Sequence, residues 1–212
     1  MTRLVLASTS PARLALLRSG GIEPITIAPG VDEEALVERS RQMGLIDGTA
    51  SMVQLLAKAK AEAVIDHPDA RGAVIIGCDS SLEFNGEALG KPHEPHIARE
   101  RWLAMRGNSG ILYSGHWVID NRDVQPNKLA PAKGKVSSSV VNFSDISDRE
   151  IDAYVATGEP LKVAGAFTID GLGGAFLSSI EGDAHTVIGL SLTTLRELAL
   201  NLGVEYTSFW NR

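Results

Sequence analysis

The 212-residue sequence is short of cysteine, of positive charge and of long apolar runs. Cys78 is its one cysteine, so no disulfide can form within the chain and nothing indicates secretion. Acidic residues outnumber Lys and Arg by 26 to 20, and this net charge of -6 argues against a nucleic-acid partner, because such binding depends on cations that meet phosphates. The first apolar run, Leu4 to Ala7, is too short for a signal peptide or a membrane span. We therefore expect a cytoplasmic protein with no membrane partner.

What the sequence does contain is an alternation of strand and helix patterns. It predicts strands at 4–7, 25–28, 73–76, 111–120 and 136–143, and a hairpin over 81–89. It predicts helices at 12–18, 52–66, 95–106, 147–158 and 192–202. Segments 31–49, 121–135 and 164–182 show no regular pattern. The interleaving predicts an α/β fold, a mixed twisted sheet flanked by helices, in one domain or two closely packed lobes.

A hydroxyl-rich turn separates the first predicted strand from the first helix. Ser10 suits the N-cap, and Pro11 suits the first helical position. Free N–H groups at a helix N-terminus attract anions. The hydroxyls of Ser8 and Ser10 and the guanidinium of Arg13 would add donors for phosphate oxygens. Taken alone, this pattern more often belongs to an ordinary capped helix with a surface arginine.

Asp79 follows the β-branched pattern of residues 73–76, within Gly77-Cys78-Asp79-Ser80. An acid at the carboxyl end of a buried strand lies where α/β folds place ligands, and it could hold a metal or activate water. The alternative is a turn carboxylate bonded to its own backbone, and the pattern does not separate the two. Cys78 is interpreted as a small buried residue, because no base is suggested beside it.

Two lysines occupy unusual places. Lys60 falls on the apolar stripe of the helix predicted at 52–66, where a charge is costly without a partner or water. It either faces a wet cleft or extends past the edge of the stripe. Lys91 stands between a glycine and a proline just after the hairpin, a place more typical of an exposed turn lysine.

Acidic and histidine clusters raise the question of a metal. Glu33 lies in an acidic run at 32–34, and adjacent carboxylates suit a hard cation such as Mg²⁺, although such a run is usually a charged loop. The two histidines within 93–96 lack partner ligands. His116 and His185 are isolated, and we predict packed or surface roles for them. The glycines at 171–174 match neither a dinucleotide fingerprint nor a Walker loop.

Taken in order, these segments resemble the Maf family of nucleotide pyrophosphatases. The most specific match is residues 75–92, where Asp79, the Asn85-Gly86 turn and Gly90-Lys91-Pro92 fall in the family's order and spacing. Further matches are residues 4–13, 32–33, 56–61, 150–160, 164–167 and 180–190. Because the resemblance covers nearly the whole chain, we expect one Maf-like domain over residues 1–212.

The resemblance implies two lobes around a cleft and hydrolysis of nucleoside triphosphates between the α- and β-phosphates. It implies Asp79 as general base or metal ligand and Glu33 as metal or water partner. Arg13, Lys60 and Lys91 would be the cations that bind the polyphosphate. The implied cofactor is a divalent metal cation, Mg²⁺ or Mn²⁺. These roles are chemically coherent, because polyphosphate charge needs several cations, and attack by water needs a carboxylate and a metal.

Four positions depart from residues that many members of the family carry. Ala12 replaces an arginine, Gly110 a histidine, Val163 a lysine and Asp170 a glutamine. In the family, that glutamine and arginine accompany the pyrimidine-triphosphate type, whereas an acid resembles the 7-methylguanosine-triphosphate type. A carboxylate only accepts hydrogen bonds, so Asp170 suits the donor edge of guanine better than uracil or thymine. The sequence therefore does not decide which base is preferred, although Asp170 favours guanine.

Two other functions fit part of this pattern. One is a non-catalytic nucleotide sensor or cell-division regulator on the same fold, which gains nothing from an acid such as Asp79 aimed at phosphates, because like charges repel. The other is a different phosphohydrolase, such as a purine-triphosphate cleaner. A nucleoside triphosphate is the expected partner in each case. The sequence does not decide which metal is preferred. It also does not decide the oligomeric state, for which a homodimer is one possibility.

Overall fold

The computed structural model describes residues 1–123 and 129–211, and its chain divides into two compact units. The first unit contains Met1–Asp79, Ser114–Ser137 and Gly189–Arg212, and the second contains Ser80–Tyr113 and Ser138–Ile188. The chain passes repeatedly from one unit to the other, so no single point in the sequence separates them. Among the described residues, none of the helices has the length and apolar character needed to cross a membrane.

The described strands form one mixed sheet. Its order is β2-β1-β3-β5-β6-β7, and β4 pairs with β3. β1 runs parallel to β2 and β3, whereas β3–β4 and β6–β7 are antiparallel. The predicted mixed α/β sheet is thereby confirmed. The bounds are β1 Leu4–Ala7, β2 Ile25–Thr26, β3 Val74–Phe84, β4 Glu87–Leu89, β5 Ser109–Asp120, β6 Ala132–Phe143 and β7 Leu177–Gly182.

All five predicted helices are present, with ends shifted by a few residues. Their caps are local: Ser10 accepts the Arg13 backbone N–H, and Ser147 and Glu150 form a capping box. Short 3-10 turns lie at Pro68–Ala70, Glu159–Lys162, Ala164–Ala166, Leu172–Phe176 and Tyr206–Phe209. The helices are α1 Pro11–Ser19, α2 Glu33–Gln42, α3 Thr49–Ala63, α4 Pro95–Met105, α5 Asp148–Ala156, α6 Ala184–Ile188 and α7 Leu192–Asn201.

Three expectations for irregular segments were wrong. The charged segment 31–49 contains α2, whose N-cap Asp32 accepts the Ala35 N–H at 3.0 Å; this helix is mostly exposed and therefore lacks a clear apolar stripe. The glycine-rich segment 164–182 contains β7. In the predicted loop 121–135, β6 already begins at Ala132, and residues 124–128 lie outside the described part.

Strand β3 is longer than predicted, because it continues through Gly77 into the predicted hairpin. An ideal Cβ at Gly77 would lie 2.2 Å from the Ala57 carbonyl oxygen and 2.9 Å from the Ala61 Cβ. One at Gly115 of β5 would lie 2.3 Å from the Val53 carbonyl oxygen. These two glycines let α3 lie directly against β3 and β5, closer than any side chain allows. Asp79 therefore lies inside β3 and not in a turn after it.

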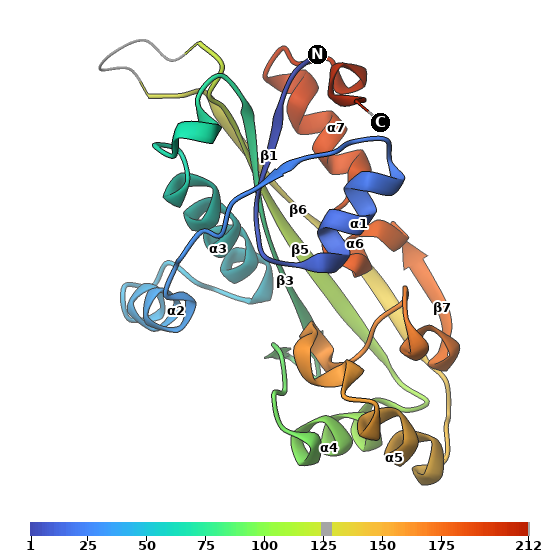
Figure 1. The fold of residues 1–212 in the computed structure, drawn as a ribbon. Coiled ribbons are helices and arrows are strands. Elements are labelled where there is room, and N and C mark those ends of the chain that lie inside the picture. Colours follow the sequence, from blue (N-terminus) through green and yellow to red (C-terminus); the bar gives the residue numbers. More distant parts are fainter. Residues whose placement is uncertain (124–128, 212) are drawn as a thin grey trace. The chain divides into compact units, whose positions relative to one another are not determined.

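In the first unit, helices cover both sides of the strands. Figure 1 shows α3 on one side and α1 and α7 on the other. Alternate residues of β1 and β3 point to opposite sides. Val5 and Ile75 pack in a cluster with Ala61 and Val64 of the α3 region. The fully buried Leu6 and Ile76 fall on the opposite side of these strands.

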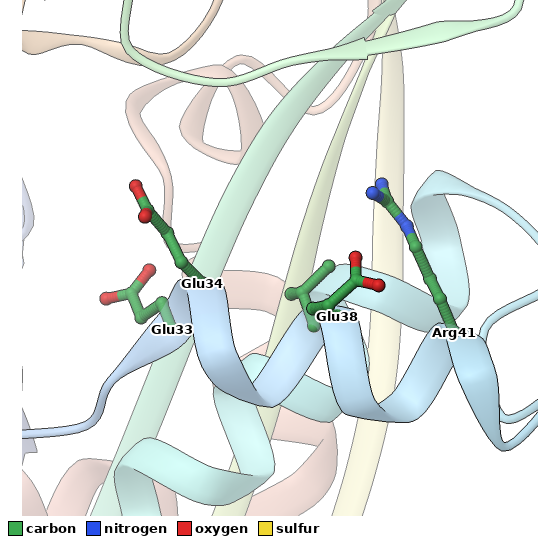
Figure 2. A pocket seen from close by; sticks show the side chains of 5 residues that line it. Glu33, Glu34, Glu38 and Arg41 are labelled. Carbon is green, nitrogen blue, oxygen red and sulfur yellow. The ribbon is translucent and has the colours of Figure 1, made fainter.

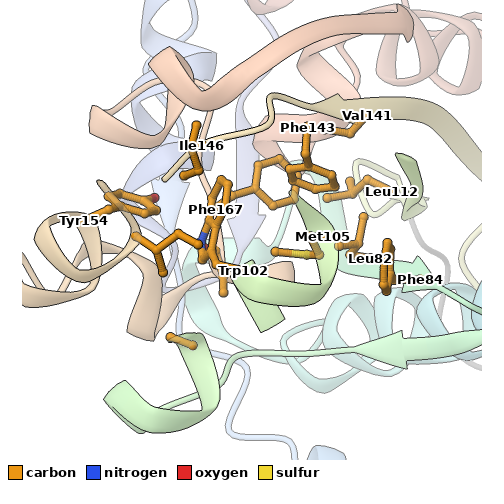
Figure 3. Packing of buried hydrophobic residues seen from close by; sticks show 13 residues of the cluster. Leu82, Phe84, Trp102, Met105, Leu112, Val141, Phe143, Ile146, Tyr154 and Phe167 are labelled. Carbon is orange, nitrogen blue, oxygen red and sulfur yellow. The ribbon is translucent and has the colours of Figure 1, made fainter. Parts of the chain in front are cut away.

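The second unit has an aromatic core around Trp102 of α4 (Figure 3). Phe143, Tyr154 and Phe176 lie edge-on to the Trp102 ring, at centroid distances of 5.6, 5.5 and 5.9 Å. The indole N–H donates to the Ala166 carbonyl at 2.7 Å. Edge-to-face contacts add to the free energy gained by burying the rings, so this cluster contributes to the stability of the unit.

Candidate active site

The turn before α1 is organised by its own hydroxyls. Ser8 is buried, and its Oγ accepts the Ser10 N–H at 3.1 Å and an Arg13 Nη1–H at 3.3 Å. Ser10 caps the helix by accepting the Arg13 N–H at 3.4 Å. The sequence therefore located this turn and its cap correctly. Both hydroxyls hold the turn and the arginine in a fixed arrangement.

Arg13 is buried, so the alternative of a surface arginine is wrong. Its Nε–H donates to the Gly189 carbonyl at 2.8 Å, and Nη1–H donates to the Cys78 carbonyl at 2.9 Å. Three segments of the first unit thus meet at one guanidinium. Because Cys78 precedes Asp79 in β3, these contacts bring a fixed positive charge next to the candidate base.

Lys60 joins the two predicted acids. Its ammonium lies 2.6 Å from Asp79 Oδ1 and 2.8 Å from Glu33 Oε1. The side chains of Lys60 and Asp79 are 8% and 12% exposed, whereas that of Glu33 is 47% exposed. Lys60 therefore does not extend past the stripe edge into solvent. The structure brings together Glu33, Lys60 and Asp79, which the sequence nominated separately.

Burial raises the pKa of Asp79, because the charged carboxylate loses its water. The positive charges of Lys60 and Arg13 oppose that rise, and Glu33 adds to it. An acid with a pKa raised from its usual range is better suited to take a proton near neutral pH than an ordinary aspartate. The alternative of a turn carboxylate bonded to its own backbone is wrong, since Asp79 bonds to Lys60 from within a strand.

The carboxylates fit a hard cation held partly by its substrate. Glu33 and Asp79 converge on one positive charge, the Lys60 ammonium. Within residues 1–123 and 129–211, no three His, Cys, Asp or Glu side chains cluster as a metal site. Mg²⁺ commonly uses one or two carboxylates and fills its other positions with water and substrate phosphates. The two acids meet that requirement, and no protein cage is needed.

An acid-rich pocket lies along α2, next to Glu33. It has a volume of about 390 Å³ and is lined by Glu33, Glu34, Val37, Glu38 and Arg41. Figure 2 shows the three glutamates and Arg41 projecting from this helix. Its negative charge makes it a poor polyphosphate site. Glu33 at the start of the helix is the residue that turns to Lys60.

Lys91 and Asp170 lie in the second unit, and both are exposed. The loop that carries Asp170 is held by Glu159, which accepts hydrogen bonds from Tyr154 Oη at 2.9 Å and Thr168 Oγ1 at 2.7 Å. It also accepts the backbone N–H groups of residues 172 and 173, both at 3.0 Å. Burial works against the charge of Glu159, but these bonds hold its pKa below the usual range. Sequence reasoning missed this anchor.

Gly110, the departure from a family histidine, has a steric reason. An ideal Cβ there would lie 2.9 Å from Leu82 Cδ1 and 3.1 Å from the Glu83 carbonyl oxygen. Any side chain there would require the Leu82 side chain to shift and the Glu83 carbonyl to move slightly. His116 was predicted as packed or surface, and it is fully buried.

Comparison with known proteins decides the family. The Maf-like protein family model matches residues 3–202 of the chain. The chain belongs to the Maf family. A nucleoside triphosphate pyrophosphatase of Leifsonia xyli is 53% identical over 99% of this chain and 97% of that protein. One of Cutibacterium acnes is 47% identical, over 99% and 95%. The solved Staphylococcus aureus Ham1 protein has a TM-score of 0.38 and 17% identity over 68% of this chain and 73% of that chain, a likeness too weak to bear on function.

Family membership confirms the resemblance drawn from the motifs. The matched range contains every residue nominated for the site: Ser8, Ser10, Arg13, Glu33, Lys60, Asp79, Lys91 and Asp170. In this Maf protein, the first six belong to one compact unit, where contacts link Ser8, Arg13 and the Asp79 strand, and Lys60 with both acids.

Proposed function

We propose that this Maf protein hydrolyses nucleoside triphosphates to nucleoside monophosphates and pyrophosphate. The observation that carries the proposal is the buried Lys60 ammonium held between Asp79 and Glu33, with Arg13 bonded to the carbonyl before Asp79. A buried acid beside fixed cations suits water activation next to an anionic substrate. The names of the Leifsonia and Cutibacterium relatives support the same activity.

Each residue of the first unit has a distinct role in this proposal. Asp79 takes the proton of the attacking water, since its raised pKa makes it the better base. Lys60 and Arg13 stabilise charge on the phosphates, and the α1 N-terminus adds backbone dipoles. Lys91 would supply a further phosphate cation, and Asp170 would contact the base. These two roles rest on the family resemblance alone.

A divalent cation, Mg²⁺ or Mn²⁺, would be held by Glu33 and Asp79. When bound, such an ion stabilises negative charge on phosphate oxygens and helps to deprotonate water. The two carboxylates and the acid-rich start of α2 supply the hard oxygen ligands that either ion prefers. The free thiol of Cys78 fits the expected cytoplasmic setting.

A screen of nucleoside triphosphates with product analysis tests the proposal. We expect a monophosphate and pyrophosphate in equal amounts, and we expect EDTA to stop the reaction and added Mg²⁺ or Mn²⁺ to restore it. Release of orthophosphate and a diphosphate would contradict cleavage between the α- and β-phosphates. Tight nucleotide binding without turnover of any triphosphate would instead support a sensor.

A further inference from the structure

His116 lies in β5, on the side of the strand away from α3. Its neighbour Gly115 faces α3, and successive residues of a strand point to opposite sides. Figure 1 shows α7 on this other side of the first unit. His116 is fully buried, although imidazole is polar. A polar side chain buried this deeply is expected to have a hydrogen-bond partner.

Its partner lies at the start of α7. His116 Nε2 accepts the backbone N–H of Ser191 at 2.8 Å. Acceptance at Nε2 assigns the neutral imidazole with its proton on Nδ1. Ser191 is itself buried and caps α7 by accepting the Thr194 N–H at 3.0 Å. His116 therefore holds the residue at which the 189–191 turn becomes a helix.

The same turn holds Arg13 at its other end. The Gly189 carbonyl accepts the Arg13 Nε–H at 2.8 Å. Gly189 has a φ of +111°, a conformation open mainly to glycine, and Leu190 between the two bonds is fully buried. A three-residue turn with both ends bonded and its middle buried has little freedom. A shift at Ser191 is therefore passed to the carbonyl that orients the guanidinium.

We propose that His116 is a positioning residue for Arg13. By accepting the Ser191 N–H it fixes the 189–191 turn, and the Gly189 carbonyl then sets the plane of the guanidinium toward the phosphate site. The proposal rests on the proposed function in taking Arg13 as a phosphate-binding cation. It needs no contact between His116 and substrate. This role differs from simple packing in the core, for which any apolar residue of similar volume would be adequate.

The test compares His116→Gln with His116→Leu. The glutamine amide oxygen can reach the Nε2 position and accept the Ser191 N–H, whereas leucine fills the space without an acceptor. We expect His116→Leu to weaken binding of inorganic pyrophosphate, measured by calorimetry with Mg²⁺ present, by about tenfold. We expect His116→Gln to stay within about threefold of wild type. Should His116→Leu fail to fold, His116→Asn replaces it, because its shorter amide stops before the Nε2 position.

The route through Arg13 is tested in an Arg13→Lys background, which keeps the charge and removes the Nε–H donor to Gly189. If His116 acts through Arg13, His116→Leu causes little further loss of pyrophosphate binding there. An equal loss in both backgrounds, or no pyrophosphate binding by the wild-type chain, overturns the proposal. The thermal unfolding midpoint of each variant is measured as well, so that a loss of stability can be told from a loss of pyrophosphate binding. Absence of triphosphate turnover in a wild-type protein that binds pyrophosphate and shows the coupling would refute the proposed function alone.

Discussion

Both units have an apolar core, but they differ in what else they bury. The first buries Arg13, Lys60, Asp79 and His116, each bonded to a partner from another segment of the same unit. The second buries a cluster of aromatic rings around Trp102. Buried charges add little to stability even when paired, whereas buried rings add much. The comparison teaches that the buried charges of the candidate site belong to the first unit, whereas a cluster of buried aromatic rings belongs to the second.

The largest effect is expected from Trp102→Ala. Removing this ring leaves a cavity among Phe143, Tyr154 and Phe176, and should lower the free energy of unfolding by about 3–5 kcal/mol. Urea titration measures the loss. Trp210→Ala is the control, because Trp210 is 51% exposed and should cost less than about 1 kcal/mol. Equal losses in the two variants would show that the buried Trp102 ring contributes no more to stability than an exposed one.

Next is Asp79→Asn, which keeps the shape and removes the base. We expect at least about a hundredfold loss of turnover in a folded protein. The control is Cys78→Ala: burial raises the pKa of this thiol to about 12 against the pull of Arg13 and Lys60, so it stays protonated and takes no part. Its backbone carbonyl still accepts from Arg13 in the variant. Near-normal turnover of Asp79→Asn would remove Asp79 from the role of base.

Lys60→Met should reduce turnover by about tenfold, through loss of one charge-assisted contact. Its pH profile is more specific. Lys60 lowers the pKa of Asp79 against the effect of burial, so its removal raises that pKa further. Turnover requires the carboxylate, and the acidic limb of the pH–rate profile should therefore move to higher pH. Lys58→Met is the control, because Lys58 is exposed on the same helix. An unshifted limb would show that Lys60 and Asp79 are not coupled in solution.

The smallest effect is expected from Asp170→Gln, which should alter the ranking of bases and leave the maximal rate nearly unchanged. A carboxylate accepts from the N1–H and amino edge of guanine, and an amide can also donate to a pyrimidine carbonyl. Catalytic efficiencies on 7-methyl-GTP, GTP, UTP and dTTP measure the ranking. Asp148→Asn, at another exposed acid of the second unit, is the control. A wild-type preference for UTP and dTTP, or an unchanged ranking in Asp170→Gln, would remove Asp170 from base choice.

The sequence alone determined the features that depend on near neighbours. Alternating apolar patterns and local caps located α1, α3, α4, α5 and α7, and motif order identified the Maf family. A cap or an apolar stripe acts within a few residues, so it can be read without the fold. The exposed α2 has a weak stripe, and it was missed for that reason.

Only the tertiary structure decided how the site is assembled. The predicted strand ended at residue 76, yet β3 continues through Gly77, where α3 comes against it. That approach puts Lys60 of the helix against Asp79 of the strand. The bond from His116 to Ser191 spans 75 positions and leaves no periodic trace. Hydrogen bonds and charge pairs between distant segments depend on close packing of backbones, and a sequence pattern records only which residues are available to form them.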